Sequence, residues 1–189
     1  MIFDKKYRDI SRTRKIYKIL QLPSHGKVID ISCGGGRLLK TIENHNSDLE
    51  LIGADITPGF LATHPELSDI TFITAEVNSI PYPDQTFDTS ICSLSLHHYK
   101  NISKVLSEIA RITKNDGQIY LIDIVPGNRL SQKFYNFIKC HEPYHFEKFY
   151  SKFEIEKLVK PFGLLINRQS NISKIPRVVA FQLTKNHGL

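Results

Sequence analysis

The chain has 189 residues, of which 41% are hydrophobic and 23% charged, values typical of one globular domain. No apolar run reaches the roughly 18 residues of a membrane span, and no leader-like hydrophobic segment follows the first methionine. The three cysteines, at positions 33, 92 and 140, offer neither an even disulfide framework nor a metal-binding Cys-x-x-Cys pair. We therefore expect a single domain over residues 1–189 that is reduced and cytoplasmic.

The net charge of +6 is concentrated at the start of the chain. Residues 1–20 carry seven Lys and Arg against two Asp, an excess of +5 that leaves the other 169 residues near neutral. A nucleic-acid groove across the domain would need basic residues along it, so this distribution argues against nucleic acid as the main partner. We expect a basic helix over residues 1–22. The charged side of this helix is expected to be a solvated face. The alternatives are that the helix closes over a ligand, contacts an anionic substrate, or touches RNA or anionic lipid.

Short apolar runs alternate with amphipathic stretches along the chain. Asn101 is predicted to cap a helix that presents one apolar face up to Ile112, and Ser151 with Glu154 forms a capping box for a helix that Pro161 ends. The predicted strands span residues 27–32, 49–55, 70–75, 86–94, 117–124, 162–169 and 177–184.

Strands separated by helices need crossover connections, and these produce a mostly parallel sheet covered on both faces. The last two predicted strands are joined by too few residues for a helix, so they should pair antiparallel. The predicted fold is α/β: a Rossmann-like open sheet of about seven strands, mostly parallel with an antiparallel last strand, and helices on both faces. In such a sheet, ligands bind at the carboxyl ends of the central strands.

A glycine-rich loop follows the first predicted strand. Residues 28–38 read Val-Ile-Asp-Ile-Ser-Cys-Gly-Gly-Gly-Arg-Leu, and glycines in such a turn let the backbone approach a ligand closely. The dinucleotide pattern is broken, because Ser32 replaces its first glycine and Arg37 its third small residue, and no Gly-Lys-Ser/Thr follows for a nucleoside triphosphate. Asp30 at the end of the strand favours a ligand that carries a cationic group.

A second acidic residue closes the second predicted strand. Asp55 lies 21 positions after Gly34, close to the spacing at which an acid at a strand end accepts hydrogen bonds from ribose hydroxyls. An isolated aspartate there is more often a turn former, but the loop at this distance favours a ribose site. S-adenosylmethionine combines a ribose with an ammonium and a sulfonium group, and it fits both observations.

These segments, in this order, resemble the class I S-adenosylmethionine-dependent methyltransferases, in the methyltransferase type 11 branch that includes quinone-biosynthesis C-methyltransferases. The acid-x-Gly-x-Gly-x-Gly motif corresponds to residues 30–36, the ribose acid to Asp55, the adenine-side segment to residues 75–84, and the end of the fourth strand to residues 93–98. The resemblance implies S-adenosyl-L-methionine as cofactor, S-adenosyl-L-homocysteine as product, and a small-molecule acceptor, which the aromatic residues of segment 128–150 predict to be apolar or aromatic. The cofactor-binding residues that it implies are Asp30, Ser32, Cys33, Gly34, Gly36, Asp55, Ile56, Glu76, Val77 and Ser93.

Three positions depart from the family pattern. Ser32 replaces the first glycine, and its Cβ would crowd the methionine moiety or demand a different backbone conformation. Glu76 stands where Asp is common and preserves an acceptor for the adenine amino group. Asn115-Asp116 replaces a Pro-Gly pair, and we expect a turn there because Asn and Asp form turns readily.

Methyl transfer from a sulfonium is an in-line displacement, so alignment supplies much of the catalysis and a base is needed only if the acceptor loses a proton. His97 and His98 follow the fourth strand, and imidazole suits deprotonation near neutral pH. We predict His97 as the catalytic residue; the alternative is a structural ring. Cys92 lies in an apolar strand and is expected to be a buried, inert thiol. No residue set has metal-ligand spacing, so no metal is expected.

Residues 128–150 are predicted to be a lid-like insertion that encloses the acceptor; the alternative is that their aromatic side chains only enlarge the core. The leading function is methyl transfer to a small molecule. A non-catalytic cofactor-binding or RNA-binding protein on the same scaffold is the alternative, because fold does not fix function. The oligomeric state stays open. The aromatic residues of the insertion are Phe134, Tyr135, Phe137, Tyr144, Phe146, Phe149 and Tyr150.

Overall fold

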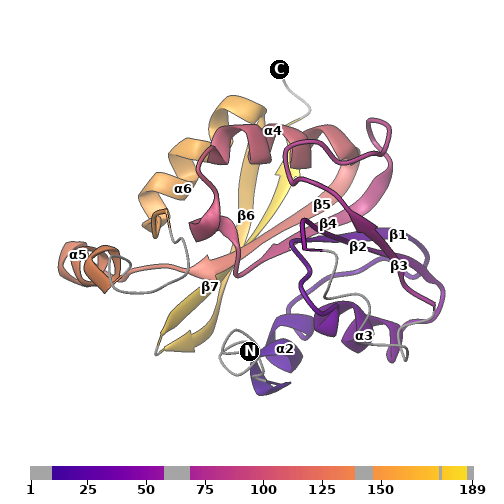
Figure 1. Cartoon of the computed structure of the whole chain (residues 1–189), viewed down its shortest axis with the longest axis horizontal. Helices are drawn as coiled ribbons and strands as arrows, with labels where there is room; N and C mark the ends of the chain where they lie inside the picture. Colours follow the sequence, from indigo (N-terminus) through magenta and orange to yellow (C-terminus); the bar gives the residue numbers. More distant parts are fainter. Residues whose placement is uncertain (1–9, 58–68, 139–146, 175, 187–189) are drawn as a thin grey trace.

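The computed structural model describes residues 10–57, 69–138, 147–174 and 176–186. Seven strands within these ranges form one sheet in the order β3-β2-β1-β4-β5-β7-β6 (Figure 1). The strands are β1 (Gly26–Ile31), β2 (Leu49–Asp55), β3 (Thr71–Thr74), β4 (Phe87–Ser93), β5 (Thr113–Ile124), β6 (Leu164–Lys174) and β7 (Arg177–Lys185).

The direction of the strands matches the sequence-based prediction. Every pair from β3 across to β5 is parallel, whereas β7 runs antiparallel to both β5 and β6. The carboxyl ends of β1, β2, β3, β4 and β5 therefore lie at one edge of the sheet. The segments that follow these strands meet at that edge, where an open α/β sheet places its ligands.

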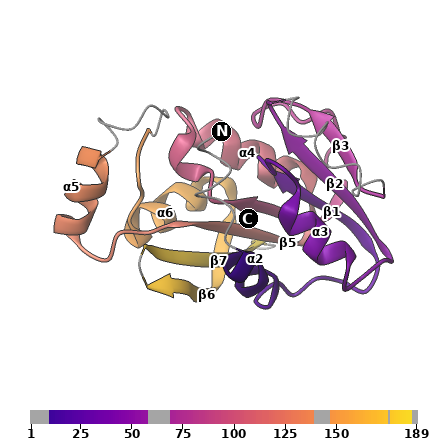
Figure 2. The same cartoon turned by 60° about the horizontal axis from the view of Figure 1, so that its bottom comes forward.

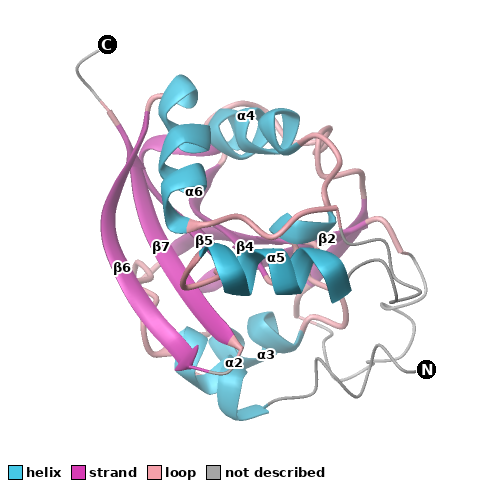
Figure 3. Cartoon of the chain, turned by 90° about the vertical axis from the view of Figure 1, so that its left-hand side faces the viewer, coloured by secondary structure: helices cyan, strands magenta, loops and turns pink. Residues whose placement is uncertain are grey.

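Helices cover both faces of the sheet, as expected. Figure 1 shows α2 and α3 on one face and α4 and α6 on the other, and the turned view in Figure 2 keeps this separation. Helix α5 lies outside both layers, beyond the end of β5, and Figure 3 shows it in front of the sheet. The helices are α2 (Ile10–Tyr17), α3 (Arg37–Glu43), α4 (Ile102–Ile112), α5 (Arg129–Ile138) and α6 (Lys152–Val159), with single 3-10 turns η3 (Leu96–His98) and η5 (Lys160–Phe162).

The predicted helix signals act as expected. The Asn101 side chain accepts a hydrogen bond from the Lys104 N–H at 3.2 Å at the start of α4, and Ser151 with Glu154 forms a complete capping box on α6. Helix α6 ends at Val159 and Pro161 lies in the 3-10 turn that follows. In the described ranges, no helix is long and apolar enough to cross a membrane.

Two predictions about the strands were wrong, one on the turn before the fifth strand and one on the end of the sixth. The expected turn at Asn115-Asp116 is absent, because β5 runs without interruption from Thr113 to Ile124. Its extra residues are accommodated by a bulge, since Phe87 of β4 pairs with Thr113 but Thr89 pairs with Gln118. Strand β6 continues to Lys174 rather than ending at 169; its exposed polar residues on the sheet edge gave no apolar alternation to reveal it.

The N-terminal helix ends before the predicted boundary at residue 22. Helix α2 ends at Tyr17, and residues 18–22 continue as a turn and loop. Ile16 anchors the helix with an exposed fraction of 4%. Residues 1–9, with part of the basic cluster, lie outside the described residues.

Candidate functional site

The loop after β1 has an unusual backbone. Ser32, Gly34 and Gly36 have φ angles of 58°, 52° and 67°, all in the left-handed region that disfavours residues with a Cβ. The Gly36 N–H donates to the Cys33 carbonyl at 3.0 Å, and Gly36 is the N-cap of α3. Ser32 thus adopts the conformation expected of the glycine that it replaces.

Cys33 fastens this loop to the neighbouring strand. Its N–H donates to the Ala54 carbonyl at 3.1 Å. A Cβ added to Gly53 would lie 2.8 Å from Cys33 Sγ and 2.6 Å from the Phe72 ring, so glycine is needed at position 53 to let the loop pack. Burial first, and then the Asp30 carboxyl, raises the pKa of the Cys33 thiol, which makes a reactive thiolate unfavourable.

Asp55 joins the ends of β1 and β2. The Gly34 N–H donates to Asp55 Oδ2 at 2.9 Å, and the Thr57 N–H donates to Asp55 Oδ1 at 2.9 Å. Each carboxylate oxygen can accept a second hydrogen bond. The side chain therefore holds the glycine loop and keeps acceptor capacity for ligand hydroxyls.

Asp30 is the most unusual titratable group of the site. It is only 3% exposed, and its Oδ1 atom is buried without a hydrogen-bond partner. Burial, with a smaller contribution from the Asp55 charge, raises the pKa of Asp30 to about 8. An unpartnered buried carboxyl costs free energy, and a cationic group of a ligand beside the loop would offset that cost. The ammonium group of S-adenosylmethionine fits this site.

The remaining predicted cofactor residues lie at the same edge. Ser93 ends β4, and the Ala75 N–H donates to the Asp55 carbonyl at 3.0 Å, which brings the segment with Glu76 and Val77 to the end of β2. Val77 packs against the core while Glu76 is exposed; Ile56 is 65% exposed. The fold thus collects all ten residues at the carboxyl edge of four adjacent strands.

His97 lies at this edge as well, but in a closed environment. Its ring is 2% exposed and stacks on the Phe149 ring with centroids 4.8 Å apart. Nδ1 lies 2.6 Å from Asp123 Oδ1; an Nδ1–H that donates to this carboxylate leaves Nε2 as the basic nitrogen. The catalytic role of His97 stays a prediction.

Sequence reasoning missed two residues of the site. Asp123 is a single charged residue in the apolar run of β5, a signal that could have marked it as a buried partner. Tyr99 follows the His-His pair without any pattern, and its hydroxyl lies 2.7 Å from Ser32 Oγ. Cys92 is buried as predicted, and burial raises the pKa of its thiol to about 12.

The aromatic segment divides into parts with different surroundings. Phe149 is buried, with an exposed fraction of 5%, whereas Phe134 and Phe137 of α5 are 60% and 65% exposed. Tyr144 and Phe146 lie outside the described residues. The predicted lid is therefore core in one part and open surface in another.

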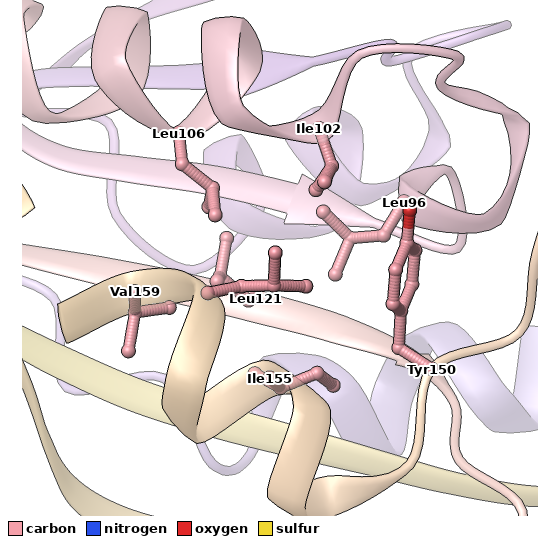
Figure 4. Close-up of a pocket in the computed structure, with 8 residues that line it drawn as sticks. Leu96, Ile102, Leu106, Leu121, Tyr150, Ile155 and Val159 are labelled. Carbon is pink, nitrogen blue, oxygen red and sulfur yellow. The ribbon is translucent and has the colours of Figure 1, made fainter. Parts of the chain in front are cut away.

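Tyr150 lines an apolar cavity between α4, α6 and β5 (Figure 4). The cavity holds about 10 Å³, roughly the room for one water molecule. It is too small for a methyl acceptor. The other lining residues are Leu96, Ile102, Leu106, Leu121, Ile155, Leu158 and Val159.

Comparison with known proteins gives consistent matches. Residues 29–121 match the family model described as a methyltransferase domain. The chain is 26% identical over 136 residues to an uncharacterized methyltransferase, YcgJ, of Bacillus subtilis, covering 68% of this chain and 53% of that protein. It is 26% identical over 129 residues to a demethylmenaquinone methyltransferase of Thermotoga maritima, covering 67% of this chain and 56% of that protein. The chain spans about half the length of the curated relatives it matches.

A solved structure extends the likeness to the whole fold. The crystal structure of a SAM-dependent methyltransferase from Aquifex aeolicus superposes with a TM-score of 0.76 at 20% identity, covering 96% of each chain. At this identity the match concerns the fold. It includes the strands beyond residue 121, which the family model does not reach.

Proposed function

Because the chain belongs to the class I S-adenosylmethionine-dependent methyltransferases, we propose that it transfers a methyl group from S-adenosylmethionine to a small, apolar or aromatic molecule. The observation that carries the proposal is the buried, unpartnered Oδ1 of Asp30 beside the glycine loop. A buried acidic oxygen favours a cation over a phosphate, and this supports binding of the cofactor's ammonium group there. The names of the quinone-methylating relatives support the acceptor class.

The residues at the carboxyl edge divide the work of holding the cofactor. Asp30 would accept hydrogen bonds from the ammonium group, and the loop from Ser32 to Gly36 would pass along the methionine moiety. Asp55 would accept from the ribose hydroxyls, with Ile56, Glu76 and Val77 on the adenine side and Ser93 across from the loop. When bound, the cofactor supplies a methyl group already activated by its sulfonium.

The protein then has to align an acceptor with that methyl group and exclude water. Residues 128–138 and 147–150, the described parts of the predicted lid, follow β5, and the aromatic side chains of the segment would suit a flat or apolar acceptor. His97 would take a proton from the acceptor where the reaction releases one, with Asp123 fixing the orientation of the ring. The proposed unit is one domain over residues 1–189, acting on a small molecule.

Calorimetry with S-adenosylmethionine and S-adenosylhomocysteine, with NAD and ATP as comparison ligands, tests the cofactor assignment. Binding of the first two and not of the others is expected. Micromolar NAD binding without binding of either methionine derivative would refute it.

The alternative, a non-catalytic or RNA-binding protein on this scaffold, rests on the basic residues of α2. It predicts salt-sensitive retention on RNA and no transfer of labelled methyl groups to small molecules. Incorporation of label from S-adenosylmethionine into a metabolite extract, without retention on RNA, would exclude that alternative.

A further inference from the structure

A chain of side-chain hydrogen bonds crosses the site from the glycine loop to the end of β4. Ser32 Oγ lies 2.7 Å from the Tyr99 hydroxyl, which donates to Ser95 Oγ at 3.0 Å. Ser95 Oγ lies 3.1 Å from Cys92 Sγ. Because the single phenolic proton is used on Ser95, the Ser32 hydroxyl donates its own proton to Tyr99.

This network meets the loop at its strained residue. Ser32 has a φ of 58°, and a residue with a Cβ in this region is disfavoured by about tenfold or more relative to its right-handed conformation. Glycine at the same position would carry no such penalty. In this structure the left-handed Ser32 makes a hydrogen bond to the Tyr99 hydroxyl, and this interaction offsets the penalty.

The conformation of Ser32 also determines where its neighbours lie. Asp30 precedes it by two residues and has the buried, unpartnered oxygen. Gly34 follows by two residues and donates its N–H to Asp55. A change of φ at Ser32 would therefore shift the loop between the two acids that the proposed function assigns to the cofactor.

We infer that Tyr99 is a positioning residue: its hydroxyl holds Ser32 in a glycine-like conformation and thereby keeps the loop in its cofactor-binding form. The inference rests on the proposed function, because it assumes that this loop binds S-adenosylmethionine. The side chain of Tyr99 acts on the cofactor only through Ser32. Its effect therefore depends on which residue occupies position 32.

Four variants test this dependence through the affinity for S-adenosylhomocysteine, measured by calorimetry. Tyr99→Phe and Ser32→Ala each break the hydrogen bond and keep the Cβ at position 32, so each should weaken binding about tenfold, as the competent loop becomes a minor conformer. Ser32→Gly supplies the reference background, because glycine adopts this φ without the hydrogen bond to Tyr99. In the Ser32→Gly background, Tyr99→Phe should not weaken the binding of S-adenosylhomocysteine any further.

Tyr120→Phe is the matched control. It also removes one phenolic hydroxyl, which here accepts a hydrogen bond from the Gln21 N–H at 2.8 Å, but its ring packs in the core cluster on the other face of the sheet from α4. It should lower the melting temperature and leave the affinity unchanged. Melting curves of every variant without ligand establish that each is folded.

The outcomes are distinguishable. An equal loss of affinity on Tyr99→Phe with serine or glycine at position 32 would overturn the inference, as would unchanged affinity in both Tyr99→Phe and Ser32→Ala. These results would leave the proposed function intact, because the wild type would still bind. Absence of binding of either methionine derivative to the folded wild type would refute the proposed function, and the inference with it.

Discussion

His97 and Asp123 are joined by two hydrogen bonds to the two oxygens of one carboxylate. His97 Nδ1 lies 2.6 Å from Asp123 Oδ1, and the His97 N–H donates to Asp123 Oδ2 at 3.0 Å. The two residues come from η3 and β5, and both are almost fully buried. This pair fixes the orientation of the His97 ring and the position of the backbone that follows β4. A substitution that tests His97 as a general base must therefore keep a hydrogen bond to Asp123, so that lost catalysis is not confused with lost structure.

His97→Asn makes that separation. The asparagine Nδ2 can replace Nδ1 as a donor to Asp123, while the basic Nε2 is lost. If His97 is the general base, transfer of labelled methyl groups should fall by about 10²- to 10⁴-fold, with affinity for S-adenosylhomocysteine within about threefold of the wild type. Activity within tenfold of the wild type in the folded variant would assign the ring a structural role.

Asp30→Asn should change the dependence of stability on pH. The pKa of Asp30 rises from 3.8 to about 8 on folding, so the folded protein holds this proton more tightly than the unfolded chain. The wild type therefore loses stability as the pH rises from about 4 to about 8, and the asparagine variant escapes that loss. At pH 9 the free energy of unfolding should favour the variant by more than about 1.4 kcal/mol, the equivalent of one pKa unit.

Urea unfolding of both proteins at pH 5 and pH 9 measures this effect, because the difference between them isolates Asp30 from other titrating groups. A gap between the two proteins that is the same at both pH values would contradict the prediction. At pH 9 the same variant should bind S-adenosylmethionine more weakly, since it has lost the charge that, in the proposed site, would face the ammonium group.

Substitutions of Asp55 should separate ribose binding from loop support. Asp55→Ala removes the acceptor for the Gly34 and Thr57 N–H groups. It should weaken S-adenosylhomocysteine binding by roughly 10- to 150-fold. It should also lower the free energy of unfolding by about 1–3 kcal/mol. Asp55→Asn keeps one acceptor oxygen and should be milder in both. Calorimetry and chemical denaturation provide the two values; unchanged affinity in the alanine variant would place the ribose elsewhere.

The aromatic segment should show two classes of substitution. Phe149→Ala truncates a buried ring that stacks on His97 and should cost about 3–5 kcal/mol of unfolding free energy. Phe134→Ala and Phe137→Ala remove exposed rings of α5 and should stay within about 0.5 kcal/mol of the wild type. If these exposed rings cover the acceptor, their loss should lower methyl transfer and spare cofactor binding. Equal methyl transfer by the wild type and both α5 variants would remove α5 from the acceptor site.

Local sequence determined much of this protein. The alternation of apolar runs with capped amphipathic helices gave the parallel sheet and its antiparallel last strand, because side-chain periodicity and caps act over a few residues. The loop composition and the spacing from Gly34 to Asp55 identified the glycine loop and Asp55 at the carboxyl edge, because parallel strands bring their ends together whatever packs around them, and the family resemblance supplied the other residues there.

Only the tertiary structure decided which partners those residues have. Asp30 became an orphaned buried acid because neighbouring strands exclude water from it, and His97 became a buried ring because Asp123 and Phe149, 26 and 52 positions away, converge on it. Tyr99 met Ser32 across 67 residues of sequence. Such contacts depend on how separate elements pack, and no local pattern of residue types encodes that packing.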